Sequence, residues 1–321
     1  MQITILGMGQ VGSSIGLSLS QYKESIKVVG YDTQIERQNF AKSIGACAST
    51  YINLHEALED ADLVVLATPY SALPELFSQI SGSLKPGAVV LCTAPNKKAT
   101  AELFKNHFPA DAQFIGLTVS FNPLYTRLLD PGDIIEKTDL FENTTIGIST
   151  PTGSNETALK YASDLVRLLG AKVLYLDILE ADGVERMATL LPTLASSTTL
   201  FTSINQPGWN DSRNTIGQPF SHIGAAYGYE APQDLAEWLL DESEAATGLL
   251  ERYIAHLIDL RDMVREADKN ALSAHFENIQ KNKQIAFEGR KSGNWEVKNE
   301  QEKTRADKGF MSRIFFGDRK K

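Results

Sequence analysis

Short apolar segments alternate with amphipathic segments along the first half of the chain. Five segments rich in Val, Ile and Leu have the composition of strands buried on both faces: 2–6, 27–31, 63–69, 88–93 and 113–117. Segments with helical spacing lie between them and end at glycine or proline turns. This alternation predicts an α/β fold, a doubly wound parallel sheet with helices on both faces.

Two more strands are predicted at 141–150 and 172–176, with a helix at 155–169 between them, so the alternation runs to about residue 177. The pattern then changes. Residues 180–203 predict a long helix that is apolar nearly all round and is interrupted at Pro192. Three further helices follow at 232–241, 242–267 and 268–288. An all-α region therefore follows the sheet.

The predicted helix 180–203 needs cover on every side, and in a domain this small a second subunit is the expected cover. The sequence thus predicts a homodimer. We expect a sheet domain over residues 1–178, an all-α dimerisation domain over 179–290 and a basic flexible tail over 291–321.

A glycine-rich turn joins the first strand to the first helix. Its six residues match G-x-G-x-x-G: Gly7, Met8, Gly9, Gln10, Val11 and Gly12. Asp32 closes the next strand, 20 residues after Gly12. Strand, glycine turn, helix, strand and acid together predict a Rossmann-type dinucleotide site, with the pyrophosphate at the helix start.

The acid at the second strand favours NAD over NADP. A carboxylate at Asp32 accepts hydrogen bonds from the ribose hydroxyls and repels a 2′-phosphate. Arg37, five residues on, can offset that repulsion, so NADP is the less favoured alternative. Thr68 and Pro69 end another strand, at the edge where ligands lie in such sheets, so we expect them near the ribose of nicotinamide. A simple strand-ending turn is the alternative.

Composition narrows the range of partners. The chain has 321 residues, 42% of them hydrophobic and 22% charged, and a net charge of −9, which argues against nucleic acid. It has neither a long apolar run nor a signal peptide, which predicts a cytoplasmic location. Cys47 and Cys92 give no metal-binding spacing, so no metal is expected. Residues 303–321 carry seven Lys or Arg and two Asp, which suits either weak membrane-surface contact or a solvated tail.

Several segments in order are similar to those of a known family. They are the glycine turn, 61–69, 140–143 with 150–152, 168–173, and the helix containing Leu191-Pro192. On these the chain resembles the prephenate and arogenate dehydrogenases of tyrosine biosynthesis. The resemblance implies a Rossmann domain joined to a helical dimerisation domain. It also implies NAD(P)-dependent oxidative decarboxylation of a small-molecule substrate.

The resemblance also suggests catalytic positions, and here the chain departs from the family. The family's His-Pro after the strand ending at Gly116 has Asn122-Pro123 as its best counterpart, and an amide can accept a hydrogen bond but does not titrate. The family's D-x-x-S-x-K pattern keeps only Lys98, with Asn96 in place of the serine. Asn122, Asn96 and Lys98 are the candidate catalytic residues, although Lys98 also suits a helix start.

Three residues are candidates for substrate binding. Arg213 fits the family's arginine for a substrate carboxylate, or else pairs with Asp211 on the surface. His222 either reaches the cleft or is a structural histidine. Ser120 lies in the altered loop after the strand 113–117. Two other functions stay open: a dehydrogenase of the same scaffold acting on another hydroxy acid or imine, and a non-catalytic NAD-binding dimer.

Overall fold

The computed structural model describes residues 1–125, 136–151, 154–227 and 231–292, with side-chain burial given up to residue 290. By compactness the chain divides into two units, Met1–Ile254 and Ala255–Lys321. The helices that follow the sheet, up to residue 254, thus belong to the same unit as the sheet. The domain limits expected from the sequence stay a prediction, and the expectations for the tail fall outside the described residues.

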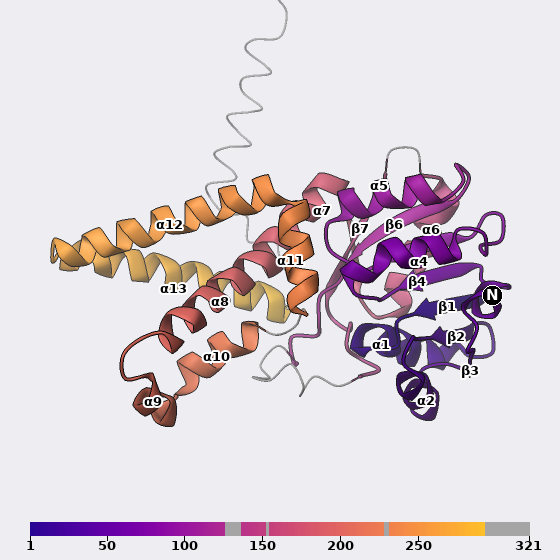
Figure 1. Cartoon of the computed structure of the whole chain (residues 1–321), viewed down its shortest axis with the longest axis horizontal. Helices are drawn as coiled ribbons and strands as arrows, with labels where there is room; N and C mark the ends of the chain where they lie inside the picture. Colours follow the sequence, from indigo (N-terminus) through magenta and orange to yellow (C-terminus); the bar gives the residue numbers. More distant parts are fainter. Residues whose placement is uncertain (126–135, 152–153, 228–230, 293–321) are drawn as a thin grey trace, which may run out of the picture. The chain divides into compact units, whose positions relative to one another are not determined.

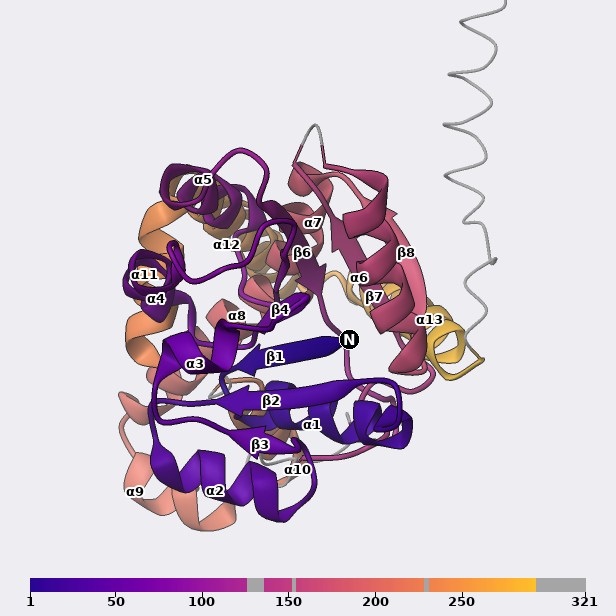
Figure 2. The same ribbon diagram turned by 90° about the vertical axis from the view of Figure 1, so that its right-hand side faces the viewer.

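One eight-stranded sheet organises the first unit (Figure 2). Its order is β3-β2-β1-β4-β5-β6-β7-β8, which reverses direction between β1 and β4 as in Rossmann folds. The strands are β1 Gln2–Leu6, β2 Lys27–Tyr31, β3 Ser49–Thr50, β4 Leu63–Leu66, β5 Val89–Cys92, β6 Gln113–Thr118, β7 Thr145–Ser149 and β8 Lys172–Leu176. The predicted fold class, a Rossmann-like sheet followed by a largely helical region, is confirmed.

One detail of the predicted sheet is wrong. Strand β7 runs antiparallel to β6, pairing Leu117 with Ile148, whereas β7 and β8 are parallel. A parallel neighbour needs a crossover connection, usually a helix, and the described part of the chain between β6 and β7 contains no helix. The short strand β3 was also not expected.

Six helices cover the two faces of the sheet: α1 Gln10–Leu19, α2 Ile35–Ser43, α3 Leu54–Leu58, α4 Leu73–Ile80, α5 Lys97–His107 and α6 Glu156–Leu168. Successive strand residues point to opposite faces, so Val64 enters one hydrophobic core and Val65 the other. One core packs α1, α2 and α6 on the sheet, and the other packs α3, α4 and α5 (Figure 2).

The helical region begins at α7, Ile178–Glu185 (Figure 1). A π-helical turn, Arg186–Leu190, links it to α8, Leu191–Ile204. The single helix predicted over 180–203 is therefore divided, because Pro192 lacks an N–H and cannot continue the α-helical hydrogen bonds from the preceding turn. The chain continues with α9 Trp209–Ser212, α10 Gln218–Ala226, α11 Pro232–Asp241, α12 Ser243–Arg265 and α13 Lys269–Ser292.

The last three helices confirm their predicted positions, while α9 and α10 were not predicted. Among the described residues, no helix combines the length and apolar character needed to cross a membrane.

Candidate active site

The glycine turn brings three backbone segments close together. Gly7 has a φ of +94°, and a Cβ there would overlap the carbonyl oxygen of Ala67 after β4. A Cβ on Gly12 would overlap the carbonyl oxygen of Gly7. These two glycines therefore allow β1, β4 and α1 to pack closely.

Gly9 faces more open space. A Cβ there would meet only the guanidinium Nη1 of Arg37, at 3.3 Å. Gly9 is also the N-cap of α1, which begins at Gln10 with no side-chain cap. The start of α1 can thus present backbone N–H groups, and the positive end of the helix dipole, to a phosphate.

Asp32 fixes this turn. Its Oδ2 accepts a hydrogen bond from the N–H of Met8 at 2.8 Å, and its Oδ1 accepts one from the N–H of Gln34 at 2.9 Å. A carboxylate has about four acceptor positions, so both oxygens can still accept from ribose hydroxyls. Arg37 donates from Nε to Gln34 Oε1 at 3.1 Å, which keeps a cation beside the acid.

The exit of β4 also fits a nucleotide. Thr68 Oγ1 is buried and has no hydrogen-bond partner among the described residues. A buried hydroxyl without a partner is costly, and one at the carboxyl edge of a doubly wound sheet suits a bound ligand. Gly9, Asp32 and Thr68 therefore make the site compatible with a nicotinamide dinucleotide.

Asn96 connects the exit of β5 to the helical region. Its φ of +54° is left-handed, and its Oδ1 caps α5 by accepting from the N–H of Ala99 at 3.3 Å. Its Nδ2 donates to Tyr70 Oη at 3.2 Å, and Tyr70 Oη donates to Asp241 at 2.6 Å. Burial, with Asp241 adding to it, raises the pKa of Tyr70 well above its usual value. Tyr70 is therefore a neutral donor that joins the sheet edge to α11.

A second set of contacts joins α7 to the start of α5. Asp182 accepts from the backbone N–H of Lys97 at 2.6 Å and of Lys98 at 3.2 Å, while the side chain of Lys98 is exposed. Burial raises the pKa of the Asp182 carboxyl. Arg186 and Glu242 form a two-point ion pair at 3.0 and 2.7 Å. Polar contacts thus dock the helices of the first unit on the carboxyl edge of the sheet.

The most buried charges of this edge were missed by the sequence analysis. Lys97 is fully buried, and its Nζ lies 2.7 Å from Oε1 of Glu185, which is 7% exposed. Lys97 Nζ also donates to the carbonyl oxygens of Thr93 and Ala94. A Cβ on Gly116 would crowd the Lys97 side chain, so the glycine in β6 makes room for it.

Glu185 has a second partner at the end of β6. Thr118, the last residue of that strand, donates from Oγ1 to Glu185 Oε1 at 3.0 Å. Glu185 Oε2 is buried with no partner among the described residues. Burial raises the pKa of Glu185, and Lys97 opposes that effect. The sequence offered one signal: Asp182 and Glu185 are three residues apart, on the same face of a largely apolar helix.

The other candidates from the sequence lie elsewhere or have other partners. Asn122 accepts from the N–H of Leu124 and donates to the carbonyl of Asp139, both at 3.1 Å, and Ser120 donates to the carbonyl of Thr145. These bonds hold the connection between β6 and β7.

Arg213 follows α9, and His222 lies on α10. Both are exposed, and within the described contacts neither bonds to the cluster around Lys97. Arg213 also forms no ion pair with Asp211 in this part of the chain. The roles assigned to these residues from the sequence stay predictions.

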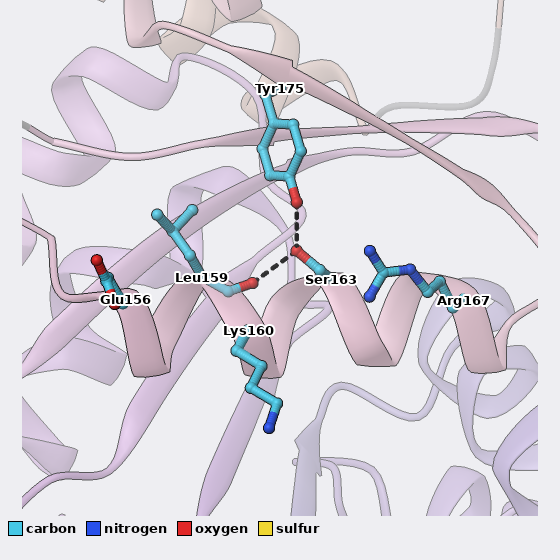
Figure 3. Close-up of a pocket in the computed structure, with 6 residues that line it drawn as sticks. All are labelled: Glu156, Leu159, Lys160, Ser163, Arg167 and Tyr175. Carbon is cyan, nitrogen blue, oxygen red and sulfur yellow. Dashed lines mark hydrogen bonds between the residues drawn. The ribbon is translucent and has the colours of Figure 1, made fainter.

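A separate hollow lies on the outer side of α6 and β8 (Figure 3). Ser163 donates to the carbonyl of Leu159 at 2.7 Å and is hydrogen-bonded to Tyr175 Oη at 3.0 Å. The polar groups that line this hollow either bond to one another or lie exposed, as Lys160 and Arg167 do. The hollow therefore does not gather reactive groups as the sheet edge does. Among the described residues, no group of His, Cys, Asp and Glu is arranged to hold a metal ion.

Comparison with known proteins gives a consistent result. Residues 2–95 match the family described as "NADP oxidoreductase coenzyme F420-dependent". The prephenate dehydrogenase of Lactococcus lactis subsp. cremoris is 26% identical over 295 residues, which covers 88% of this chain and 77% of that protein. The cyclohexadienyl dehydrogenase of Zymomonas mobilis is 21% identical over 286 residues, covering 87% and 94%.

Solved structures show the same fold. The prephenate dehydrogenase from Aquifex aeolicus, in complex with hydroxyphenyl propionate and NAD+, superposes with a TM-score of 0.75 at 20% identity, covering 89% of this chain and 98% of that one. The arogenate dehydrogenase of Synechocystis gives a TM-score of 0.69 at 18% identity, covering 88% and 99%. In sequence the chain is therefore distantly similar to a prephenate dehydrogenase and a cyclohexadienyl dehydrogenase, and it shares the fold of the prephenate and arogenate dehydrogenase structures.

Proposed function

We propose that this protein is an NAD-dependent dehydrogenase of the prephenate or arogenate type. In this reaction a hydride leaves the ring carbon that bears the hydroxyl group, a carboxylate departs as CO₂, and the ring becomes aromatic. The similarity to a prephenate dehydrogenase across 88% of this chain, sheet and helices together, carries the proposal. Because aromatisation makes the reaction strongly downhill, the protein has mainly to position the donor carbon and polarise the hydroxyl.

The glycine turn and its neighbours hold the nucleotide in this proposal. The backbone from Gly7 to Gly12 approaches the pyrophosphate, Asp32 accepts from the adenosine ribose, and Thr68 and Pro69 lie by the nicotinamide ribose. The bound nicotinamide supplies the hydride acceptor. Asp32 favours NAD, and Arg37 beside Gly9 makes NADP the weaker alternative.

Two exposed cations are proposed for the substrate. Lys98 lies at the start of α5, and Arg213 on the turn after α9, so each is accessible to a carboxylate. His222 and Ser120 remain further proposed contacts. We assign Asn96 to a positioning role, because its amide already bonds Tyr70 and caps α5.

A homodimer is part of the proposal. In the first unit, Phe201 and Ile204 of α8 are 72% and 51% exposed. In the second unit, exposed apolar side chains recur on both helices, among them Leu257, Phe276 and Phe287. Exposed apolar side chains, on each unit taken by itself, are what a protein interface would cover. Light scattering on the purified protein tests it, and a monomer at micromolar concentration would contradict it.

A turnover assay tests the activity. The purified protein is incubated with NAD or NADP and with prephenate or arogenate, and the absorbance of the reduced nicotinamide is followed. We expect reduction with one of the two substrates and a preference for NAD. No reduction with either substrate and either cofactor would reject the assignment.

A second function is favoured by one observation. Within the first unit, His55 and His107 are hydrogen-bonded to Ser83 and Leu103, and His222 is exposed on α10, so among the described contacts none of them bonds to Lys97, Glu185 or Thr118. A dehydrogenase of the same scaffold acting on another hydroxy acid or imine is therefore the alternative. A screen of such substrates with NAD distinguishes the two, and NAD binding without any turnover would indicate a non-catalytic dimer.

A further inference from the structure

Three side chains are in contact at the end of β6: Thr118 of β6 and Lys97 of α5 both contact Oε1 of Glu185, on α7. We propose that Thr118 binds the substrate hydroxyl as the catalytic residue of this chain, and that Glu185, held by Lys97, receives the proton through Thr118. The inference rests on the proposed function, and it assigns to these three residues the task for which the sequence offered Asn122.

The position of Thr118 suits this role. It ends β6 at the carboxyl edge of the sheet, the edge that also holds the glycine turn and Thr68. Thr118 is partly exposed, whereas Glu185 behind it is buried. A substrate can therefore contact Thr118, which in turn bonds to the buried Glu185. Asn122 lacks this arrangement because it is 3% exposed and its amide is bonded within the loop, to Leu124 and Asp139.

The hydrogen-bond polarity of Thr118 is fixed by its partner. An ionised carboxylate only accepts, so Thr118 Oγ1 must donate its hydrogen to Glu185 Oε1. The lone pairs of Thr118 Oγ1 then remain to accept from a substrate O–H. A threonine bonded to a backbone carbonyl has the same polarity, but the carbonyl cannot take up a proton, whereas Glu185 can.

Lys97 favours the ionised form of Glu185, the form that can accept a proton, while burial and Asp182 oppose it. Lys97 from α5 contacts Oε1, while Asp182 on the same helix α7 repels the negative charge, and the thiol of Cys92 on β5 is also close. Burial raises the pKa of Glu185, so this pKa lies closer to neutral pH than that of an exposed glutamate, which suits a general base. The relay delivers the proton to Oε1, the oxygen that Thr118 and Lys97 both contact, while Oε2 has no partner in the described chain.

The step balances within the proposed reaction. The C–H electron pair of the carbinol carbon leaves as hydride to the nicotinamide, and the O–H electron pair forms the C=O bond. The hydroxyl proton passes to Thr118 Oγ1 as the proton of Thr118 passes to Glu185. When the carboxylate leaves as CO₂, the C–C electron pair enters the ring, and the resulting phenolate oxygen regains a proton from Glu185 through Thr118.

The test compares Thr118→Val, Thr118→Ser and Glu185→Gln with Thr4→Val as a matched control. Thr4 is a buried strand threonine in β1 whose hydroxyl bonds to a backbone carbonyl, that of Ala57. We expect Thr118→Val to lower kcat about 10²- to 10⁴-fold with little change in KM, as for loss of general acid–base catalysis. Thr118→Ser should retain most activity, and Thr4→Val should leave kcat unchanged.

The pH profile separates a proton acceptor from a structural group. In the wild type, kcat should fall as the pH drops through the pKa of Glu185. Glu185→Gln should have a low kcat that no longer shows this acid limb, with NAD affinity measured by calorimetry as the check on folding. An unchanged acid limb in Glu185→Gln, or wild-type kcat in Thr118→Val, would overturn the proposal.

A binding measurement distinguishes failure of the relay from failure of the proposed function. The probe is a para-hydroxyphenyl carboxylate, titrated in the presence of NAD. If the wild type turns over neither substrate but binds the phenol about tenfold more tightly than Thr118→Val, the hydroxyl site stands and the assigned reaction fails. If turnover is normal and the Thr118 variants match the wild type, the relay fails alone. If the wild type shows no turnover and does not bind the phenol, both the relay and the proposed function are overturned.

Discussion

Replacing Lys97 by methionine tests the ion pair on which the cluster at the end of β6 is built. Methionine keeps an unbranched side chain of similar length in the space over Gly116 but removes the charge. At an effective dielectric constant of about 20, two unit charges 2.7 Å apart attract by about 6 kcal/mol, most of which offsets the cost of burying them. Removing one partner leaves Glu185 buried and unpaired, which costs about 3 to 5 kcal/mol.

The assay is thermal unfolding near neutral pH. At about 2 to 4 °C per kcal/mol for a chain of this size class, Lys97→Met should lower the Tm by about 6 to 20 °C. Lys97→Met combined with Glu185→Gln should recover most of that loss, because no unpaired charge then remains buried.

The loss of stability in Lys97→Met should depend on pH. Burial raises the pKa of Glu185 above its ordinary 4.5, so the penalty of Lys97→Met is full above the raised pKa and disappears as the pH falls toward 4.5. A Tm for Lys97→Met within about 2 °C of the wild type near neutral pH would refute the reasoning. So would a double variant no more stable than the single one.

Three further predictions concern the nucleotide site and the opposite edge of the sheet. Gly12→Ala should lower both the Tm and the NAD affinity, because its Cβ would overlap the glycine turn. Gly183→Ala on α7 is the control: its Cβ would have open space, so it should raise stability by about 0.4 to 1 kcal/mol. Thermal unfolding measures the stability of each variant, and calorimetry its NAD affinity. Asp32→Ala should weaken NAD binding about 10- to 100-fold and improve NADP relative to NAD, and equal NAD affinity would contradict it. The hydrogen bond from Lys85 holds the pKa of Asp62 below its usual 3.8, so this carboxylate stabilises the fold above that pH and loses the effect in stronger acid. Asp62→Asn should therefore lower the free energy of unfolding by less than about 1 kcal/mol near neutral pH and leave it unchanged in acid. The activity should stay at the wild-type level.

The sequence predicts the parts of the fold that local patterns determine. The strands around Val64 and Val90 are continuous apolar runs, and the glycine turn with Asp32 follows a spacing set by one β-α-β unit. The reversal of β7 lies outside such patterns, since strand direction depends on the path of the connection and not on the strand's own residues. The π-helical turn before Pro192 could not be predicted either, because the proline indicates only that the helix is interrupted and not which form the preceding turn takes.

The candidate site was harder to predict because its members are distant in sequence. In the sequence, Lys97 is one of two adjacent lysines at the start of a predicted helix, and Glu185 lies 88 positions later. No local sequence pattern therefore indicates that the two form a buried ion pair. The expectation for Asn122 followed the order of motifs, whereas the structure shows that its amide is used within the loop. Asp32 was identifiable because its partner, the glycine turn, lies in the same unit.

The measurement that tests the central claim most directly is the rate of nicotinamide reduction by the purified 321-residue chain, supplied with NAD and either prephenate or arogenate, together with the release of CO₂. The account predicts stoichiometric reduced nicotinamide and CO₂ with one of these substrates, and strong loss of that rate in Thr118→Val. Reduction of NAD without CO₂ release, or no reduction while NAD binds normally, would contradict it.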